Sequence, residues 1–238
     1  MRRLFAIFTL LLLTVGFTHG KERSVEVCYR DMNCCTRTIT LDWEDGTLRW
    51  WAHLNNEVVV APSHLAMMTD RGTWGQSIES ANIERIDHIN YSGAVVDFGD
   101  FSVEIRAYKE GVAYRFISNV EGDYKIVDEL AEFSFGEEDM AWIPYVNYRP
   151  DATSDYATHY ETSFENTYTH TALKDIDWRR LIFAPIVVEH NGIRAWISES
   201  NLEDYPGMFL SNRDENGVLD TEFAPRPKEV EQGGHNML

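Results

Sequence analysis

The sequence predicts an all-β protein of mostly antiparallel strands, stacked as sheets in one domain. Apolar and polar side chains alternate over several short stretches, turn-forming residues separate these stretches, and helical periodicity is scarce. The chain has 238 residues, of which 44% are hydrophobic and 13% aromatic. This length suits one large all-β domain, and the apolar fraction is sufficient for a substantial core.

The first expected strands form a meander. Ile39, Leu41 and Trp43 alternate with polar residues, as in a half-buried strand. Turn-forming residues at 44–46 and 55–56 separate this strand from the next two. The three expected strands cover residues 38–43, 48–54 and 57–60. Residues 62–90 lack such a pattern, and we expect a loop with a short turn there.

A hairpin is expected over residues 101–117. Its first strand places Phe101, Val103 and Ile105 on one face and polar residues on the other. The turn at 109–111 ends in glycine, and an apolar strand returns over residues 112–117.

A second hairpin is expected over residues 182–197. Asn191-Gly192 favours a type I′ turn between strands at 182–189 and 193–197. Pro185 lies inside the first of these strands and predicts an edge position or a bulge. Residues 219–223 are expected to form a further strand.

The first twenty residues are typical of a cleaved signal peptide. Arg2 and Arg3 form a basic start, an apolar run covers 4–15, and small residues occupy the cleavage positions before residue 21. The apolar run is short for a membrane span. We therefore expect an exported protein whose mature domain is residues 21–238.

Export permits disulfide bonds among the three cysteines. A bridge from Cys28 to Cys34 or to Cys35 would close a short loop and leave the third sulfur free or able to pair with another chain. A zinc site ranks lower, because three sulfurs without a nearby histidine do not complete four ligands.

The net charge of −18 excludes some partners. Such a surface repels nucleic acid and anionic membranes. A neutral or cationic ligand is compatible with it, although solubility alone accounts for most of the charge.

General catalytic motifs of hydrolases, nucleotide-binding proteins and metalloproteases do not occur in the sequence. One polar cluster contains His159-Tyr160-Glu161, with Glu165 and His170 following. Its oxygens suit calcium and its imidazoles suit zinc, while a solvated loop is the ordinary explanation. Carboxylates are so frequent that spacing alone nominates no glycosidase pair.

A second polar cluster, residues 198–208, directly follows the second hairpin. Loops at the ends of a sandwich commonly carry function, and Pro206-Gly207 is a turn pair. A plain connector is the alternative interpretation.

The order and spacing of several short motifs resemble the N-terminal domain of family 97 glycoside hydrolases. The most specific motif is Ile197-Ser198-Glu199-Ser200-Asn201-Leu202 followed by Asp204-Tyr205-Pro206-Gly207-Met208. The likeness extends from about Val25 to Leu238. The other matching stretches are Asp45-Gly46-Thr47-Leu48, Val60-Ala61-Pro62-Ser63-His64-Leu65, Lys109-Glu110-Gly111-Val112-Ala113-Tyr114-Arg115-Phe116, Glu132-Phe133-Ser134-Phe135, Trp142-Ile143-Pro144 and Tyr160-Glu161.

This resemblance implies a β-super-sandwich like that of galactose mutarotases, followed in the family by a (β/α)₈ barrel. The resemblance implies an exo-acting α-glucosidase or α-galactosidase. Members of the family are mainly periplasmic, so the chain is expected in the periplasm or secreted. Their calcium ion takes one glutamate from the N-terminal domain, which matches Glu161 here. Glu199, Asp204 and Tyr205 are expected to bind substrate or face the barrel.

The family's catalytic carboxylates lie in the barrel, so the resemblance implies no catalytic residue in this chain. We expect it to be inactive alone and to act on α-linked oligosaccharides only together with a barrel of the same polypeptide. A free-standing carbohydrate-binding sandwich is the alternative, and a structural domain without ligand is the third. Mutarotase activity is suggested by fold analogy only.

Overall fold

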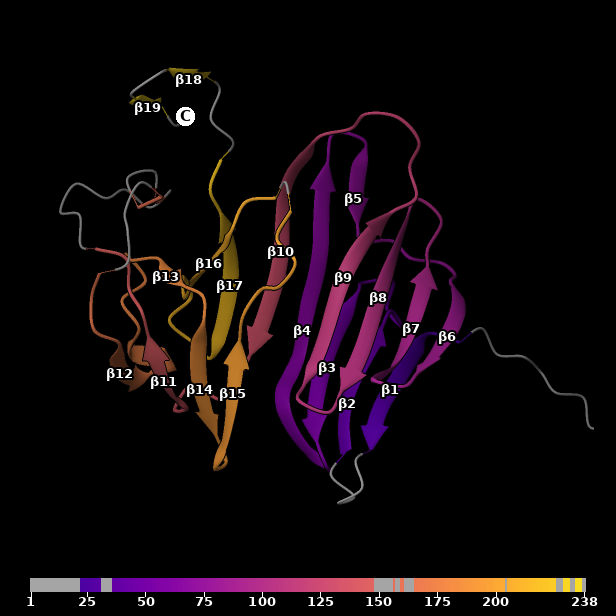
Figure 1. The fold of residues 1–238 in the computed structure, drawn as a ribbon, viewed down its shortest axis with the longest axis horizontal. Coiled ribbons are helices and arrows are strands. Elements are labelled where there is room, and N and C mark those ends of the chain that lie inside the picture. The colour runs from indigo at the N-terminus through magenta and orange to yellow at the C-terminus, as the bar shows by residue number, and fades with distance from the viewer. Residues whose placement is uncertain are drawn as a thin grey trace, which may run out of the picture.

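The structure, a computed structural model, describes residues 22–30, 36–147, 156, 159–160, 165–203, 205–225, 229–231 and 234–236 (Figure 1). Every strand pair in these ranges is antiparallel, and the regular structure there is otherwise one short 3₁₀ turn, η1 (Leu173–Asp175). These ranges contain no helix of the length and apolarity that crossing a membrane requires. The predicted all-β, antiparallel fold class is therefore confirmed.

A large sheet forms the base of the molecule. Its strands follow the order β1-β2-β3-β4-β10-β17-β16-β13, and β5 pairs with β4 outside this path. The bounds are β1 (Ser24–Arg30), β2 (Thr36–Asp42), β3 (Arg49–Leu54), β4 (Glu57–Thr69), β5 (Gly72–Trp74), β10 (Ile126–Ser134), β13 (Ile182–Phe183), β16 (Met208–Ser211) and β17 (Val218–Phe223).

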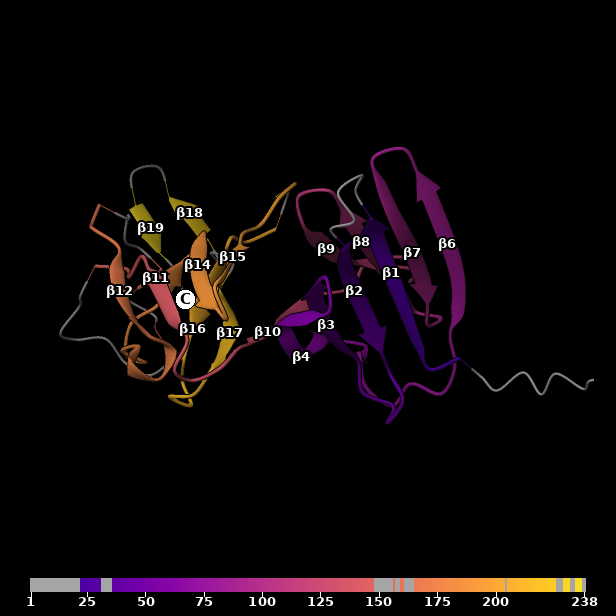
Figure 2. The same ribbon diagram turned by 90° about the horizontal axis from the view of Figure 1, so that it is seen from below.

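Two four-stranded sheets lie side by side on one face of the large sheet (Figures 1 and 2). The first has the order β6-β7-β8-β9, and the second has the order β12-β11-β14-β15. Their bounds are β6 (Asn82–His88), β7 (Tyr91–Asp97), β8 (Phe101–Tyr108), β9 (Val112–Ser118), β11 (Met140–Ile143), β12 (Thr169–Ala172), β14 (Ile186–His190) and β15 (Ile193–Ile197). The result is a super-sandwich in which edge strands β9 and β15 face each other. A separate pair, β18 (Glu229–Glu231) and β19 (Gly234–Asn236), lies near the C-terminus.

Alternating apolar side chains produce the core of the first sandwich. Ile39 and Leu41 of β2 and Val103 and Ile105 of β8 are fully buried. Burying each such side chain stabilises the fold by about 1.5–3 kcal/mol. The polar residues of β2 are nearly as buried, because β2 is an inner strand that pairs with β1 on one side and β3 on the other.

The predicted meander is confirmed as β2, β3 and β4, and the hairpin at 101–117 is confirmed as β8 and β9. The loop predicted over residues 62–90 is wrong, because β4 continues to Thr69 and β5 and β6 follow it. Pro62 argued against a strand here, because proline has no N–H to donate to a neighbouring strand. The pairing of β3 with β4 shifts register around Pro62, and this irregularity accommodates it.

The single strand predicted at 182–189 is also wrong. It is two strands in different sheets, with β13 in the large sheet and β14 in the second small sheet. Pro185 separates them, as expected of a residue that cannot donate to a ladder. The Asn-Gly turn that follows is confirmed, since Asn191 and Gly192 both have positive φ, 48° and 78°.

Several predictions fall outside the described residues. These are the signal peptide at 1–20, the calcium ligand Glu161, the loop residue Asp204, and the cysteines Cys34 and Cys35. Cys28 is exposed on β1.

Candidate functional site

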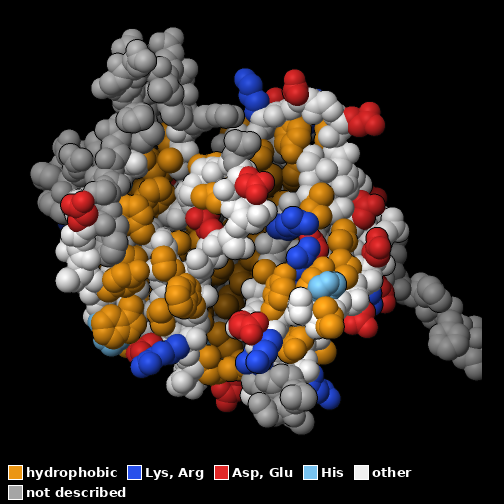
Figure 3. Space-filling view, in the orientation of Figure 1, with side chains coloured by type: hydrophobic (Ala, Val, Ile, Leu, Met, Phe, Trp, Pro, Cys, Tyr) orange, Lys and Arg blue, Asp and Glu red, His pale blue; other side chains and the backbone are white. Residues whose placement is uncertain are grey.

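A groove of about 690 Å³ follows the junction between the two small sheets. Edge strands β9 and β15 form its walls, and β3, β4, β10 and β17 of the large sheet form its floor. The loop after β15 closes one side. Figure 3 shows this region as a hollow with hydrophobic side chains at its base. Its volume lies in the range typical of small-molecule sites.

Aromatic rings stiffen the floor of the groove. Trp50 of β3 is only 3% exposed and donates its indole N–H to the backbone carbonyl of Glu132 at 3.1 Å. Its ring centroid lies 4.9 Å from that of Tyr114 and 5.6 Å from that of Phe133. Burial and then the nearby charge of Glu129 raise the pKa of Tyr114 well above its usual range, so its hydroxyl stays protonated.

Two carboxyl groups face the same groove, Glu129 from β10 and Glu199 from the loop after β15. Burial raises the pKa of Glu129. The hydrogen bond from Tyr205 lowers it in part, and the negative charge of Glu199 raises it further. Burial also raises the pKa of Glu199, although the backbone N–H of Met208 donates to it at 2.9 Å. Such carboxyl groups protonate more readily than exposed ones and can then donate hydrogen bonds to a ligand.

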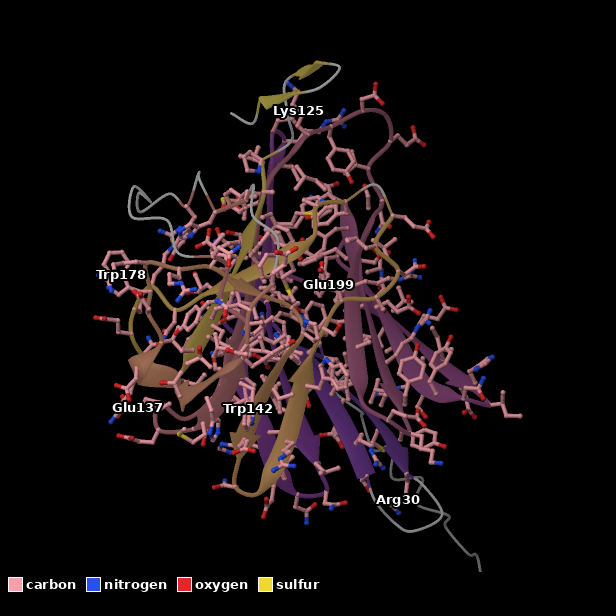
Figure 4. All side chains as sticks on the ribbon, turned by 60° about the vertical axis from the view of Figure 1, so that its left-hand side comes forward. Arg30, Lys125, Glu137, Trp142, Trp178 and Glu199 are labelled. Atoms are coloured by element: carbon pink, nitrogen blue, oxygen red, sulfur yellow. The ribbon has the colours of Figure 1, made fainter. Side chains whose placement is uncertain are left out.

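The loop that carries Glu199 is fastened at both ends. The Glu199 carboxylate accepts from Met208 at the start of β16, and Figure 4 shows Glu199 beside the junction. The Tyr205 hydroxyl donates to Glu129 at 2.5 Å, and its ring meets Phe223 edge-on at 5.6 Å. The structure therefore brings together two of the residues predicted as substrate-binding or barrel-facing, Glu199 and Tyr205.

Tyr160, the residue before Glu161, lies on the face of the large sheet opposite the groove. The Tyr160 ring packs edge-on against Phe209 at 5.4 Å. Phe209 follows Met208, which lines the groove, and successive residues of a strand point to opposite faces. Tyr160 is thus separated from Glu199 and Tyr205 by the thickness of the sheet.

The polar cluster expected around residue 160 is dispersed. His159 is fully buried, and its ring Nδ1 accepts the N–H of Leu181 at 3.3 Å. His170 lies on β12, where its ring stacks on Trp142 and its Nε2 is 3.5 Å from Glu189. Glu165 is exposed. Within the described ranges, no three His, Cys, Asp or Glu side chains are arranged to hold a metal.

Glu161 itself lies outside the described residues. Calcium takes six or more oxygen ligands, and a single glutamate supplies at most two. A calcium site that uses Glu161 would therefore need oxygens from other residues as well.

Sequence reasoning missed Glu129. In β10, residues 129, 131 and 133 share the face that lines the groove. Only two apolar residues, Ala131 and Phe133, mark this face of β10 in the sequence. Ile126 and Val127 are apolar but exposed, so they hide the alternation that would have identified the strand.

Comparison with known proteins identifies the family. The sequence pattern described as glycosyl-hydrolase 97 N-terminal matches residues 32–230. The chain belongs to glycoside hydrolase family 97 and represents its N-terminal domain. It is 35% identical over 202 residues to a retaining alpha-galactosidase of Bacteroides thetaiotaomicron, covering 77% of this chain and 30% of that protein.

Solved structures share the fold of this N-terminal domain. A family 97 enzyme from Pseudoalteromonas sp. strain K8, in complex with acarbose, superposes with a TM-score of 0.63 at 19% identity. A beta-arabinopyranosidase superposes with a TM-score of 0.64 at 15% identity. The matches cover 83% and 86% of this chain but only 32% and 36% of those proteins. The chain thus spans about a third of the length of its relatives.

Proposed function

We propose that this chain is the non-catalytic N-terminal sandwich of an exported, exo-acting α-glycosidase. One observation supports this proposal most directly. The family match covers residues 32–230, while the chain spans only about a third of the length of its relatives. In the complete enzyme a barrel would supply the catalytic carboxylates, and an α-linked glucoside or galactoside would be the substrate.

The groove loop would contribute to the rim of the active site. Two contacts, from Glu199 to Met208 and from Tyr205 to Glu129, fix the positions of Glu199 and Tyr205 in this loop. A loop held in this way can present backbone and side-chain groups to a neighbouring domain at low entropic cost. Asp204 lies between these anchors in the sequence and would face the barrel.

Glu161 would supply one calcium ligand, and the barrel would supply the others. Tyr160, which directly precedes Glu161 in the sequence, packs against Phe209. A calcium ion beside the active site would polarise an oxygen of the substrate or orient a catalytic carboxylate.

The test uses the polypeptide that contains both the sandwich and the barrel. Glu161→Gln is expected to raise the calcium concentration needed for half-maximal hydrolysis of p-nitrophenyl α-glycosides about tenfold or more. Glu165→Gln, a nearby change at an exposed residue, is the matched control and is expected to have no such effect. The isolated chain is expected to hydrolyse neither the α-glucoside nor the α-galactoside. Hydrolysis by the isolated chain, or an unchanged calcium requirement in Glu161→Gln, would overturn the corresponding part of the proposal.

A free-standing carbohydrate-binding sandwich is the second candidate. The aromatic floor of the groove favours it, because Trp50, Tyr114 and Phe133 create an apolar base beside polar groups. Calorimetry of the isolated chain with α-linked oligosaccharides tests this candidate, because the absence of any heat of binding would exclude it.

A further inference from the structure

Two exposed tryptophans lie in one row across the outer face of the second small sheet. Trp142 of β11 is 40% exposed and Trp196 of β15 is 71% exposed. Both are paired in register with Val187 of β14, which lies between them, and Trp142 is also paired with His170 of β12. The row therefore runs His170, Trp142, Val187, Trp196 across all four strands.

The indole of Trp142 is held in place although much of it is exposed. His170 stacks on it with ring centroids 4.3 Å apart and planes 13° apart. Ordering an exposed aromatic side chain brings little hydrophobic stabilisation, so the stacking contact with His170 pre-organises a surface for something outside the chain.

A fixed carboxylate lies beside this row. Desolvation opposes ionisation of Glu189, but the hydrogen bond and the positive charge of Arg194 help to outweigh it and lower the pKa of this group. The Arg194 guanidinium donates to Glu189 at 3.1 Å, and its side chain is 78% exposed. A ligand on the row would thus meet a hydrogen-bond acceptor and several N–H donors next to the rings.

The two tryptophans are close enough for one oligosaccharide to reach both. Trp142 and Trp196 are two strands apart, and adjacent strands are about 4.8 Å apart, so their backbones are about 10 Å apart with Val187 between them. Hydrophobic side chains gather over β11, β14 and β15 in Figure 3, and Figure 4 labels Trp142 on this sheet.

We propose that Trp142 and Trp196, with Val187 between them and Glu189 and Arg194 at the edge, form a binding site for a neutral hexopyranose unit of an oligosaccharide. The apolar C–H face of a pyranose would stack on an indole, and its hydroxyls would donate to Glu189 and accept from Arg194. The net charge of −18 disfavours acidic glycans, which selects the uncharged class. The site consists of residues of this chain alone and does not depend on the proposed glycosidase function.

The experiment titrates the isolated chain with maltotetraose and cellotetraose, both uncharged, and follows the indole N–H signals by two-dimensional NMR. Trp142 and Trp196 are expected to shift with at least one sugar at millimolar concentration. Trp142→Ala and Trp196→Ala are each expected to weaken binding about tenfold, which corresponds to the loss of one stacking contact. Because Trp196 is largely exposed, Trp196→Ala tests the site even if Trp142→Ala perturbs the fold.

One control separates this site from other surfaces. Trp178→Ala removes another exposed indole, labelled in Figure 4 away from the row, and is expected to leave binding unchanged. Arg194 and Trp196 also line the edge of the groove, so the separate signals of the Trp142 and Trp196 indoles, rather than a groove variant, locate the bound sugar. The proposal is overturned if neither sugar shifts the two indoles, or if the Trp142 and Trp196 variants bind as well as the parent chain.

Discussion

The hydroxyl of Tyr205 donates to the carboxylate of Glu129 at 2.5 Å and joins the loop after β15 to the central strand β10. The two residues are 76 positions apart in the sequence. This bond spans the boundary between the two halves of the super-sandwich, because β10 is the strand that links β4 of the first half to β17 of the second. It is therefore a suitable place to test how the groove is held.

Tyr205→Phe removes this hydrogen bond and leaves the half-buried Glu129 carboxylate with one donor fewer. The free energy of unfolding is expected to fall by about 1–2 kcal/mol. Urea denaturation measures it, with Tyr29→Phe on β1 as the control at the other end of the sheet. Equal stability of Tyr205→Phe and the parent chain would show that this bond does not fasten the loop.

Trp50 is expected to be the most sensitive position in the groove floor. Trp50→Ala removes a buried indole together with its contacts to Tyr114 and Phe133, and its cost is expected to be about 3–5 kcal/mol. Trp50→Phe keeps part of the packing but loses the hydrogen bond to the Glu132 carbonyl, so a smaller loss is expected. Thermal unfolding measures both, and a Trp50→Phe variant less stable than Trp50→Ala would contradict this description of the floor.

Asp220 of β17 is expected to make stability fall as pH rises. Burial, then the charges of Glu132 and Asp214, raise its pKa from 3.8 to about 6. The folded state thus holds this proton more tightly than the unfolded state. The stabilising contribution is complete below pH 3.8 and is lost as pH rises through about 6.

Asp220→Asn removes this contribution. Between pH 3.8 and about 6, the free energy of unfolding of the variant should rise progressively relative to that of the parent chain. Unfolding by urea across this range gives the difference, and Glu84→Gln, an exposed change on β6, is the control. A parallel pH dependence in parent and Asp220→Asn would rule out this half-buried carboxyl as its source.

The isolated chain is expected not to accelerate mutarotation of fresh α-glucose. The histidine considered for such chemistry, His159, is fully buried with its ring Nδ1 already accepting from Leu181, and it lies beside Tyr156 rather than in the groove. Polarimetry measures the rate with and without the chain. A rate that rises in proportion to the chain concentration would refute this expectation.

The sequence predicted local pairing better than it predicted the site. Alternation and turn residues identified β2, β3, β8, β9 and β15, because these signals act within a few residues. Pro62 and Pro185 misled the prediction in opposite ways, since one lies at a register shift inside a strand and the other separates two sheets. The contact between Tyr205 and Glu129 depends on the order of strands in the large sheet, which local periodicity does not contain.

We propose above that this chain is the N-terminal sandwich of a larger glycosidase. The most direct measurement is to read the coding DNA beyond the Leu238 codon. We predict an open frame that continues for several hundred residues of alternating strand and helix, with acidic residues at the ends of strands, as a (β/α)₈ barrel requires. A stop codon directly after Leu238 would contradict the claim and would leave the sugar-binding sandwich as the better account.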